Sequence, residues 1–314
     1  MRYLNPKADL TFKKVFGEHP DLIISFLNAL LPFDKADEEI TWVEYLNPEL
    51  VPQNPLRKDS IVDVRCRDKA GRQFIVEMQM MWTSAYKQRV LFNASKAYVS
   101  QLDKGGDYDL LHPVYSLNLV NDTFSDSLDY YHDFRIVEVA ETKEVIEGLR
   151  FIFIELPKFT PKNYGDKKMQ VLWLRYLTEI NEKTREVPEE LLENPEINKA
   201  VTQLEESAFS EAQLLGYDRF WDMVSTAKMQ ISSSRREAME KGRAEGLEKG
   251  LAKGRAEGLE KGLAEGRIKG RTEGLAEGQQ MERVKNARNL KNLGIDKEII
   301  AKATGLTVDE IDYL

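Results

Sequence analysis

Two acidic residues and one amide lie close together in a stretch that has the character of two β-strands. Asp63 precedes a segment rich in turn formers, and Glu77 and Gln79 follow that segment. Two carboxylates that approach closely repel each other unless a cation lies between them. Mg²⁺ prefers such oxygen ligands and retains water molecules, one of which can attack a phosphodiester. These residue types therefore indicate metal-dependent hydrolysis, provided that the fold brings them together.

The length of the turn decides whether the two acids meet. If residues 69–71 form a three-residue loop with Gly71 at positive φ, residue 68 faces residue 72 and Asp63 lies opposite Glu77. Gln79 then shares their face, because side chains alternate along a strand. A loop of two or four residues would place Asp63 on the opposite face from Glu77. The expected site therefore depends on an odd loop length.

The elements around this hairpin predict an α/β fold. Strand patterns occur at residues 113–120, 134–139 and 151–156, and helical patterns occur at residues 9–17, 21–31 and 85–102. The prolines between residues 33 and 57 argue against a helix there. We expect a mixed sheet of about five strands with helices on its faces. Further helical patterns, without strand signals, follow at residues 171–177, 197–215 and 217–232.

The hairpin and the opening of the chain resemble a known family. Asp63 followed by Glu77-Met-Gln79 resembles the divergent PD-(D/E)XK nuclease motif, with Gln79 where the common form has lysine. The segment Lys7-Ala-Asp9-Leu-Thr-Phe12-Lys13-Lys14-Val-Phe16-Gly17 is similar to the opening of the recombination-promoting nuclease and putative transposase family, a bacterial branch of that group. The resemblance is strongest over residues 7–156. It implies a restriction-endonuclease-like core.

The resemblance also implies roles for particular residues. Asp63 and Glu77 would bind Mg²⁺, for which Mn²⁺ or Ca²⁺ could substitute, and Gln79 would orient the attacking water or the phosphate. Asp9 would support the metal shell. The side chains expected to contact DNA phosphates are those of Lys13, Lys14 and Arg89. No organic cofactor is expected. Gly105-Gly106 follows a helix rather than a strand, so we interpret it as a helix stop and not as a phosphate-binding loop.

Two of these residues also have simpler interpretations. Asp9 is placed to cap the N-terminus of the helix at residues 9–17, a contact worth about 1 kcal/mol. Arg89 lies on a predicted amphipathic helix and could be an ordinary solvated charge. It would contact phosphate only if this helix packs beside the acid-bearing strands.

An internal repeat places glycine at every fourth position from Gly242 to Gly278. The other positions are mostly strong helix formers, yet each glycine costs roughly 0.8–1 kcal/mol relative to alanine in a helix. Glycines four residues apart form a groove that lets two helices approach closely. Because the period exceeds 3.6, the groove drifts around the helix and partners would wind right-handed. Self-association through this tract and a solvated spacer are the two interpretations, and self-association explains the regular register better.

Composition describes a soluble protein: 314 residues, a net charge of −8 and 42% hydrophobic residues. The single cysteine, Cys66, excludes an internal disulfide and favours a cytoplasmic location. No signal pattern or membrane-spanning run is expected. We divide the chain into a nuclease-like core at residues 1–165, a helical extension at 166–236, a glycine-repeat segment at 237–280 and a small helical C-terminal segment at 281–314 that could bind a protein partner.

The resemblance thus implies a metal-dependent DNA endonuclease that acts in recombination, mobile-element movement or defence. The rival hypothesis is a catalytically weak or inactive nuclease fold that binds DNA or assembles through its tail. Lysine at position 79 would stabilise negative charge as it develops, whereas the neutral Gln79 does not, and this difference is what keeps the rival open.

Overall fold

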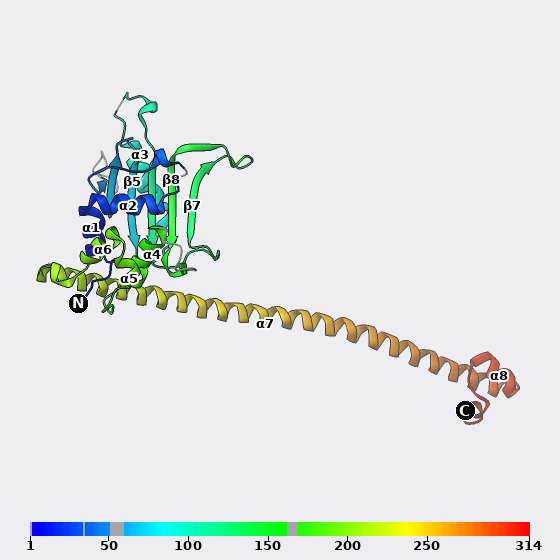
Figure 1. The fold of residues 1–314 in the computed structure, drawn as a ribbon. Helices are drawn as coiled ribbons and strands as arrows, with labels where there is room; N and C mark the ends of the chain where they lie inside the picture. The colour runs from blue at the N-terminus through cyan, green and yellow to red at the C-terminus, as the bar shows by residue number, and fades with distance from the viewer. Residues whose placement is uncertain (1, 34, 51–59, 104, 162–168) are drawn as a thin grey trace. The chain divides into compact units, whose positions relative to one another are not determined.

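The chain forms two compact units, Met1–Gln230 and Ile231–Leu314, in a computed structural model that describes residues 2–33, 35–50, 60–103, 105–161 and 169–314 (Figure 1). The first unit contains a six-stranded mixed sheet in the order β1-β4-β5-β6-β8-β7. Strands β5, β6 and β8 are parallel to one another, and the remaining pairs are antiparallel. The strands are β1 (Val43–Tyr45), β4 (Val64–Asp68), β5 (Gln73–Gln79), β6 (Val114–Val120), β7 (Tyr131–Val137) and β8 (Val145–Glu155).

The prediction of an α/β fold with a mixed sheet is confirmed, but the sheet has six strands rather than about five. The additional strand is β1, which lies within residues 33–57. The sequence analysis argued against a helix in this segment and assigned no strand to it. Strand β1 is only three residues long, which is too short to show a period of two. A second, two-stranded sheet pairs β2 (Glu49–Leu50) with β3 (Ser60–Ile61).

Helices cover both faces of the six-stranded sheet (Figure 1). The side chains of Val64 and Val76 pack into a large core with the helices of one face, whereas Ile75 packs against the helix on the other. The helices of the first face are α1 (Asp9–Glu18), α2 (Pro20–Leu30), α4 (Met169–Glu179), α5 (Glu189–Leu192) and α6 (Pro195–Thr202), and the helix of the second face is α3 (Tyr86–Val99). Short 3₁₀ helices lie at Ala36–Glu38, Tyr108–Leu110, Leu156–Lys158 and Glu206–Ala208.

The β4–β5 hairpin has the three-residue loop on which the expected site depends. Gly71 has φ of +84°, and the N–H of Asp68 donates to the carbonyl of Arg72 over 3.0 Å. The register that follows pairs Val64 with Val76. A Cβ atom at Gly71 would lie 2.5 Å from the His112 ring, so both the backbone conformation and the packing require glycine.

Two expectations about helix ends are wrong. Asp9 is the first residue of α1 rather than its N-cap, since Ala8 holds the cap position and no side chain bonds there. Residues 197–215 do not form one helix, because α6 ends at Thr202 and the next helix begins at Glu211. The segment between them buries Leu204 and Phe209 without forming an α-helix. The spacing of these apolar residues in the sequence resembles that of a helix, which explains the wrong prediction.

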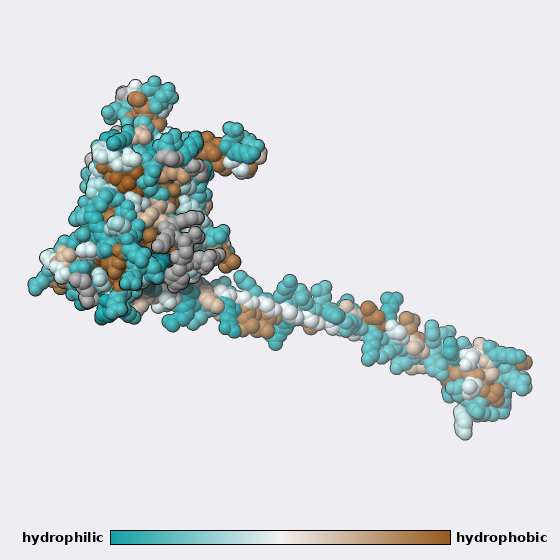
Figure 2. Space-filling model, viewed as in Figure 1, coloured by the Kyte–Doolittle hydropathy of each residue, from teal (hydrophilic) through white to brown (hydrophobic). Residues whose placement is uncertain are grey.

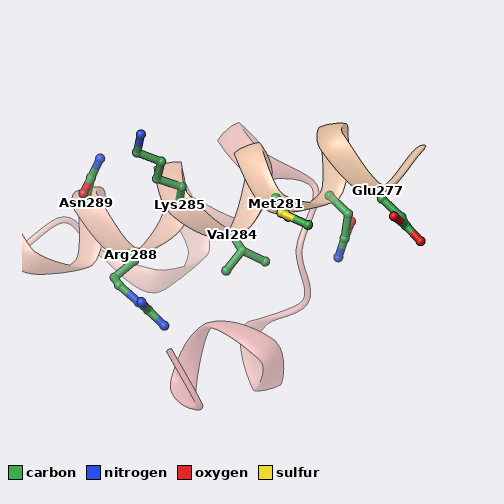
Figure 3. Close-up of a pocket in the computed structure, with 7 residues that line it drawn as sticks. Glu277, Met281, Val284, Lys285, Arg288 and Asn289 are labelled. Carbon is green, nitrogen blue, oxygen red and sulfur yellow. The ribbon is translucent and has the colours of Figure 1, made fainter. Parts of the chain in front are cut away.

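The 82-residue helix α7 (Glu211–Asn292) contains the glycine tract, and α8 (Lys297–Thr304) and α9 (Val308–Asp312) complete the second unit. The side chain of Asp296 caps the N-terminus of α8, and Thr307 forms a capping box with Glu310 at the N-terminus of α9. A small core of Ala287, Ile300, Leu306 and Ile311 joins these helices, and Val284 points toward it from the wall of a shallow cavity (Figure 3). None of the helices in the described residues is both long and apolar enough to cross a membrane.

Candidate active site

Asp63 and Glu77 lie side by side where strand β4 begins. Glu77 is on β5 with 5% of its surface exposed, and Asp63 occupies a bend directly before β4. The Met78 N–H donates to Asp63 Oδ2 over 2.7 Å. In a regular antiparallel ladder this N–H would bond to the carbonyl of Val62, so the Asp63 carboxylate replaces a backbone acceptor. This bond fixes the acid beside Glu77.

Helix α3 supplies the partners of Glu77. Asn93 Nδ2 donates to Glu77 Oε1 over 2.9 Å, and Arg89 Nη2 approaches Glu77 Oε2 at 3.3 Å. The same Arg89 nitrogen donates to Gln79 Oε1 over 2.7 Å. Ser60 Oγ donates to Asn93 Oδ1 over 2.5 Å and so turns the Asn93 amide nitrogen toward Glu77.

Burial makes both carboxylates reluctant to ionise. It raises the pKa of Asp63 to about 6, and the bond from the Met78 N–H opposes the shift while the charge of Glu77 adds to it. Burial also raises the pKa of Glu77, although Arg89 and Asn93 oppose the shift. A cation between the two groups would favour both ionised forms.

Four of the predicted site residues come together: Asp63, Glu77, Gln79 and Arg89. The charges of Asp9 and Lys13 also act on Asp63, and these two side chains form an ion pair at 2.7 Å, so both lie near the acids.

Lys14 is engaged elsewhere and does not join this group. Its Nζ atom donates to the carbonyl of Ala208 over 3.1 Å and lies 3.9 Å from the centre of the Phe209 ring.

The sequence reading missed three residues around Glu77. Asn93 binds its carboxylate, Tyr86 stacks 4.7 Å from the Arg89 guanidinium, and Asn118 pairs with Glu77 in the sheet and accepts a hydrogen bond from the Tyr86 hydroxyl. Helical spacing could have found the first two, because residues three and four apart share a face with Arg89. Nothing local in the sequence places Asn118 beside Glu77.

The donor set suits a hard divalent cation that keeps much of its water. Among the described residues, no group of three or more His, Cys, Asp or Glu side chains could hold a metal, so two carboxylates would supply the charge. Mg²⁺ is commonly held by one or two carboxylates with water completing the octahedron. The Met78 carbonyl, next to Glu77 in the chain, would be a further oxygen ligand. Asp63 and Glu77 therefore fit Mg²⁺.

Comparison with known proteins identifies one family. The family model for PD-(D/E)XK nuclease family transposases matches residues 6–233, which include both acids, helix α3 and the helical region after the sheet. No curated protein and no solved structure matches the chain.

Proposed function

The chain belongs to the PD-(D/E)XK nuclease family transposases, and from this premise we propose that it is a Mg²⁺-dependent DNA endonuclease with a role in recombination, mobile-element movement or defence. The observation that carries the proposal is the pairing of Asp63 with Glu77, two carboxylates whose pKa values are raised by burial. A fold gains nothing from two such groups unless they bind something. Mn²⁺ or Ca²⁺ could take the place of Mg²⁺.

Asp63 and Glu77 would hold the metal, which would polarise the phosphate and lower the pKa of bound water. Gln79 is fixed by its bonds to Arg89 and to the Met81 carbonyl, at 2.7 and 2.6 Å, so its amide is oriented before substrate arrives. A preorganised polar group stabilises a transition state without a cost of reorientation. Gln79 would thereby position the attacking water or the phosphate.

Arg89 offers the positive charge that Gln79 lacks. Without metal, its guanidinium neutralises Glu77, and almost half of its side chain remains exposed. Metal bound at Glu77 would replace this ion pair and leave Arg89 to contact the phosphate. Lys13 would provide a second phosphate contact, with Asp9 orienting its ammonium group.

The direct test uses purified full-length protein and supercoiled plasmid. We expect Mg²⁺ to support nicking or linearisation and excess chelator to abolish it, because no charge-neutralising cation would then lie between the acids. Gel electrophoresis over a time course measures the products. Nicking that continues in chelator, or that survives both Asp63→Ala and Glu77→Ala, would show that the activity has another source.

A second function, self-association, is supported by the surface of α7. A Cβ added at any glycine from Gly242 to Gly278 meets nothing within 4 Å, and leucines such as Leu259 and Leu263 are 67% and 59% exposed. Figure 2 shows brown hydrophobic patches among hydrophilic ones along this helix. We propose that a second copy of the tract covers these glycines and leucines. Two further proposals concern the neighbouring segments: residues 166–236 belong with the core, and residues 281–314 bind a protein partner.

Sedimentation tests the self-association. We expect the full chain to have at least twice the mass of one chain, and a chain that ends at Arg236 to be monomeric, because an isolated glycine-rich helix leaves both its groove and its leucines in water. Leu259→Glu with Leu263→Glu should have the effect of the truncation, whereas Lys253→Glu, on the same tract, serves as the charge control. An unchanged mass in the truncated chain would contradict the proposal.

A further inference from the structure

A polar cleft lies on the same sheet face as the acid pair. It has a volume of about 640 Å³, and its polar walls come from β4, from the β4–β5 loop and from the segments after α3. The residues that matter for its chemistry are Arg65, Arg67, Lys69, Gln73 and His112. Side chains two residues apart on a strand lie on the same face, so positions 63, 65 and 67 share one face of the sheet. Arg65 pairs with Ile75 on β5, and the Ile75 side chain packs against α3 on that face. The cleft therefore continues the face that carries Asp63 and Glu77.

Positive charge in this cleft exceeds the negative charge that balances it. Two carboxylates line it, but Arg67 forms an ion pair with Glu44, and Asp68 is held at 2.7 Å by Arg72. Within the part of the chain that the structure describes, neither Arg65 nor Lys69 forms an ion pair. Two cations are thus left over, in a protein whose net charge is −8.

The guanidinium of Arg65 is held in place by neutral groups. Its Nη2 and Nε atoms donate to Gln73 Oε1 at 2.9 and 3.3 Å, and Nη1 donates to the Asn47 carbonyl at 3.4 Å. Arg67 carries a second positive charge two residues further along the same face of β4. A partly buried cation that is fixed by neutral acceptors and repelled by its neighbour lacks an anion, and a bound phosphate would supply one.

We propose that this cleft binds phosphates of the DNA strand on one side of the cleaved bond, with Arg65 and Lys69 as the contacts. Strand geometry separates positions 63 and 67 by about 13 Å, a distance that spans a few nucleotides of a backbone. A strand that passes Glu77 and follows β4 would reach Arg65 first and Lys69, at the hairpin loop, last. The path assigned to the DNA strand rests on the proposed nuclease function. The inference adds to that function a binding site for the DNA backbone that lies outside the acid pair.

DNA binding in chelator tests this cleft without cleavage. The full-length chain is titrated against a fluorescent 30-base-pair duplex at several NaCl concentrations, with anisotropy as the readout. We expect Arg65→Gln and Lys69→Gln each to weaken binding roughly 3- to 10-fold at low salt and to reduce the slope of log K against log[NaCl] by about 1, because each removes one phosphate contact. Lys143→Gln, an exposed charge on the β7–β8 connection, is the matched control and should bind as the wild type.

The outcomes separate the cleft from the nuclease proposal. Lys69 is exposed in a turn, so its replacement tests the cleft even if Arg65→Gln impairs folding. Wild-type affinity and salt slope in Lys69→Gln and in folded Arg65→Gln would overturn the cleft, whatever the plasmid assay shows. Loss of binding in these variants, in a protein that never cleaves plasmid, would support the cleft and overturn only the nuclease. Equal loss in Lys143→Gln would show that general charge, and not the cleft, binds the DNA.

Discussion

Replacing Glu77 by glutamine is expected to reduce plasmid cleavage at least about 100-fold while the protein remains folded. The substitution keeps the shape of the side chain and its acceptor for the Asn93 amide, but it removes half of the negative charge offered to a metal. Loss of a single well-placed electrostatic contact at a reacting centre commonly costs two to three orders of magnitude. Initial rates of nicking over a range of Mg²⁺ concentrations measure the effect.

The stability of this variant distinguishes a chemical role from a structural one. Burial raises the pKa of Glu77, which means that the fold disfavours the ionised form despite the Arg89 partner. A neutral glutamine should therefore leave the melting temperature in chelator unchanged or slightly higher. If Glu77 were instead a structural anchor for Arg89, its loss would lower the melting temperature and reduce activity only in proportion to unfolding.

The matched control is Glu147→Gln, which changes the same atoms at an exposed position of β8. It should cleave plasmid as the wild type does. Full activity in the Glu77→Gln variant would be incompatible with a metal site at this pair.

The hairpin was predictable because its information is local. The turn formers at residues 68–71 locate the turn, and the three-residue loop that the structure shows there fixes the register and with it which carboxylates meet. Helix α3 was also visible in the sequence, and with it the possibility that Arg89 lies at the site. The fold class follows from the same local patterns.

Other features could not be predicted, because distant segments create them. The Val62 N–H bonds to the Pro48 carbonyl, so the chain leaves the hairpin ladder one residue before Asp63 and lets its side chain bond to Met78 instead. The first half of β8 contains no buried residue and shows no alternation of burial, so the sequence analysis placed the start of this strand at residue 151 rather than at Val145. No pattern within either segment reveals its partner.

Asp63 itself should make the metal-free protein sensitive to pH. Its pKa is about 3.8 when the chain is unfolded and about 6 in the fold. Because the folded value is higher, the fold binds the proton more tightly, and ionisation of Asp63 opposes folding. The penalty is absent below pH 4, grows between pH 4 and 6, and is complete above pH 6. Its size is about 2–3 kcal/mol, at 1.36 kcal/mol per pKa unit.

Asp63→Asn removes this penalty and keeps an oxygen to accept the Met78 N–H. In chelator at pH 7.5 we expect the variant to be more stable than the wild type by up to about 2–3 kcal/mol, and at pH 4 the two should agree. Urea unfolding across this pH range, followed by circular dichroism, measures the difference. The exposed Asp109→Asn is the control and should follow the wild type at every pH.

Mg²⁺ should close this gap in stability. The wild type would gain about 2.7 kcal/mol when the free metal concentration is 100 times its dissociation constant, because binding to the folded state alone stabilises that state. The Asp63→Asn variant should gain little, since it has lost one of the two carboxylates. Parallel responses of the two proteins to Mg²⁺ would mean that the metal binds elsewhere, and the buried carboxylate of Asp63 would then need another explanation.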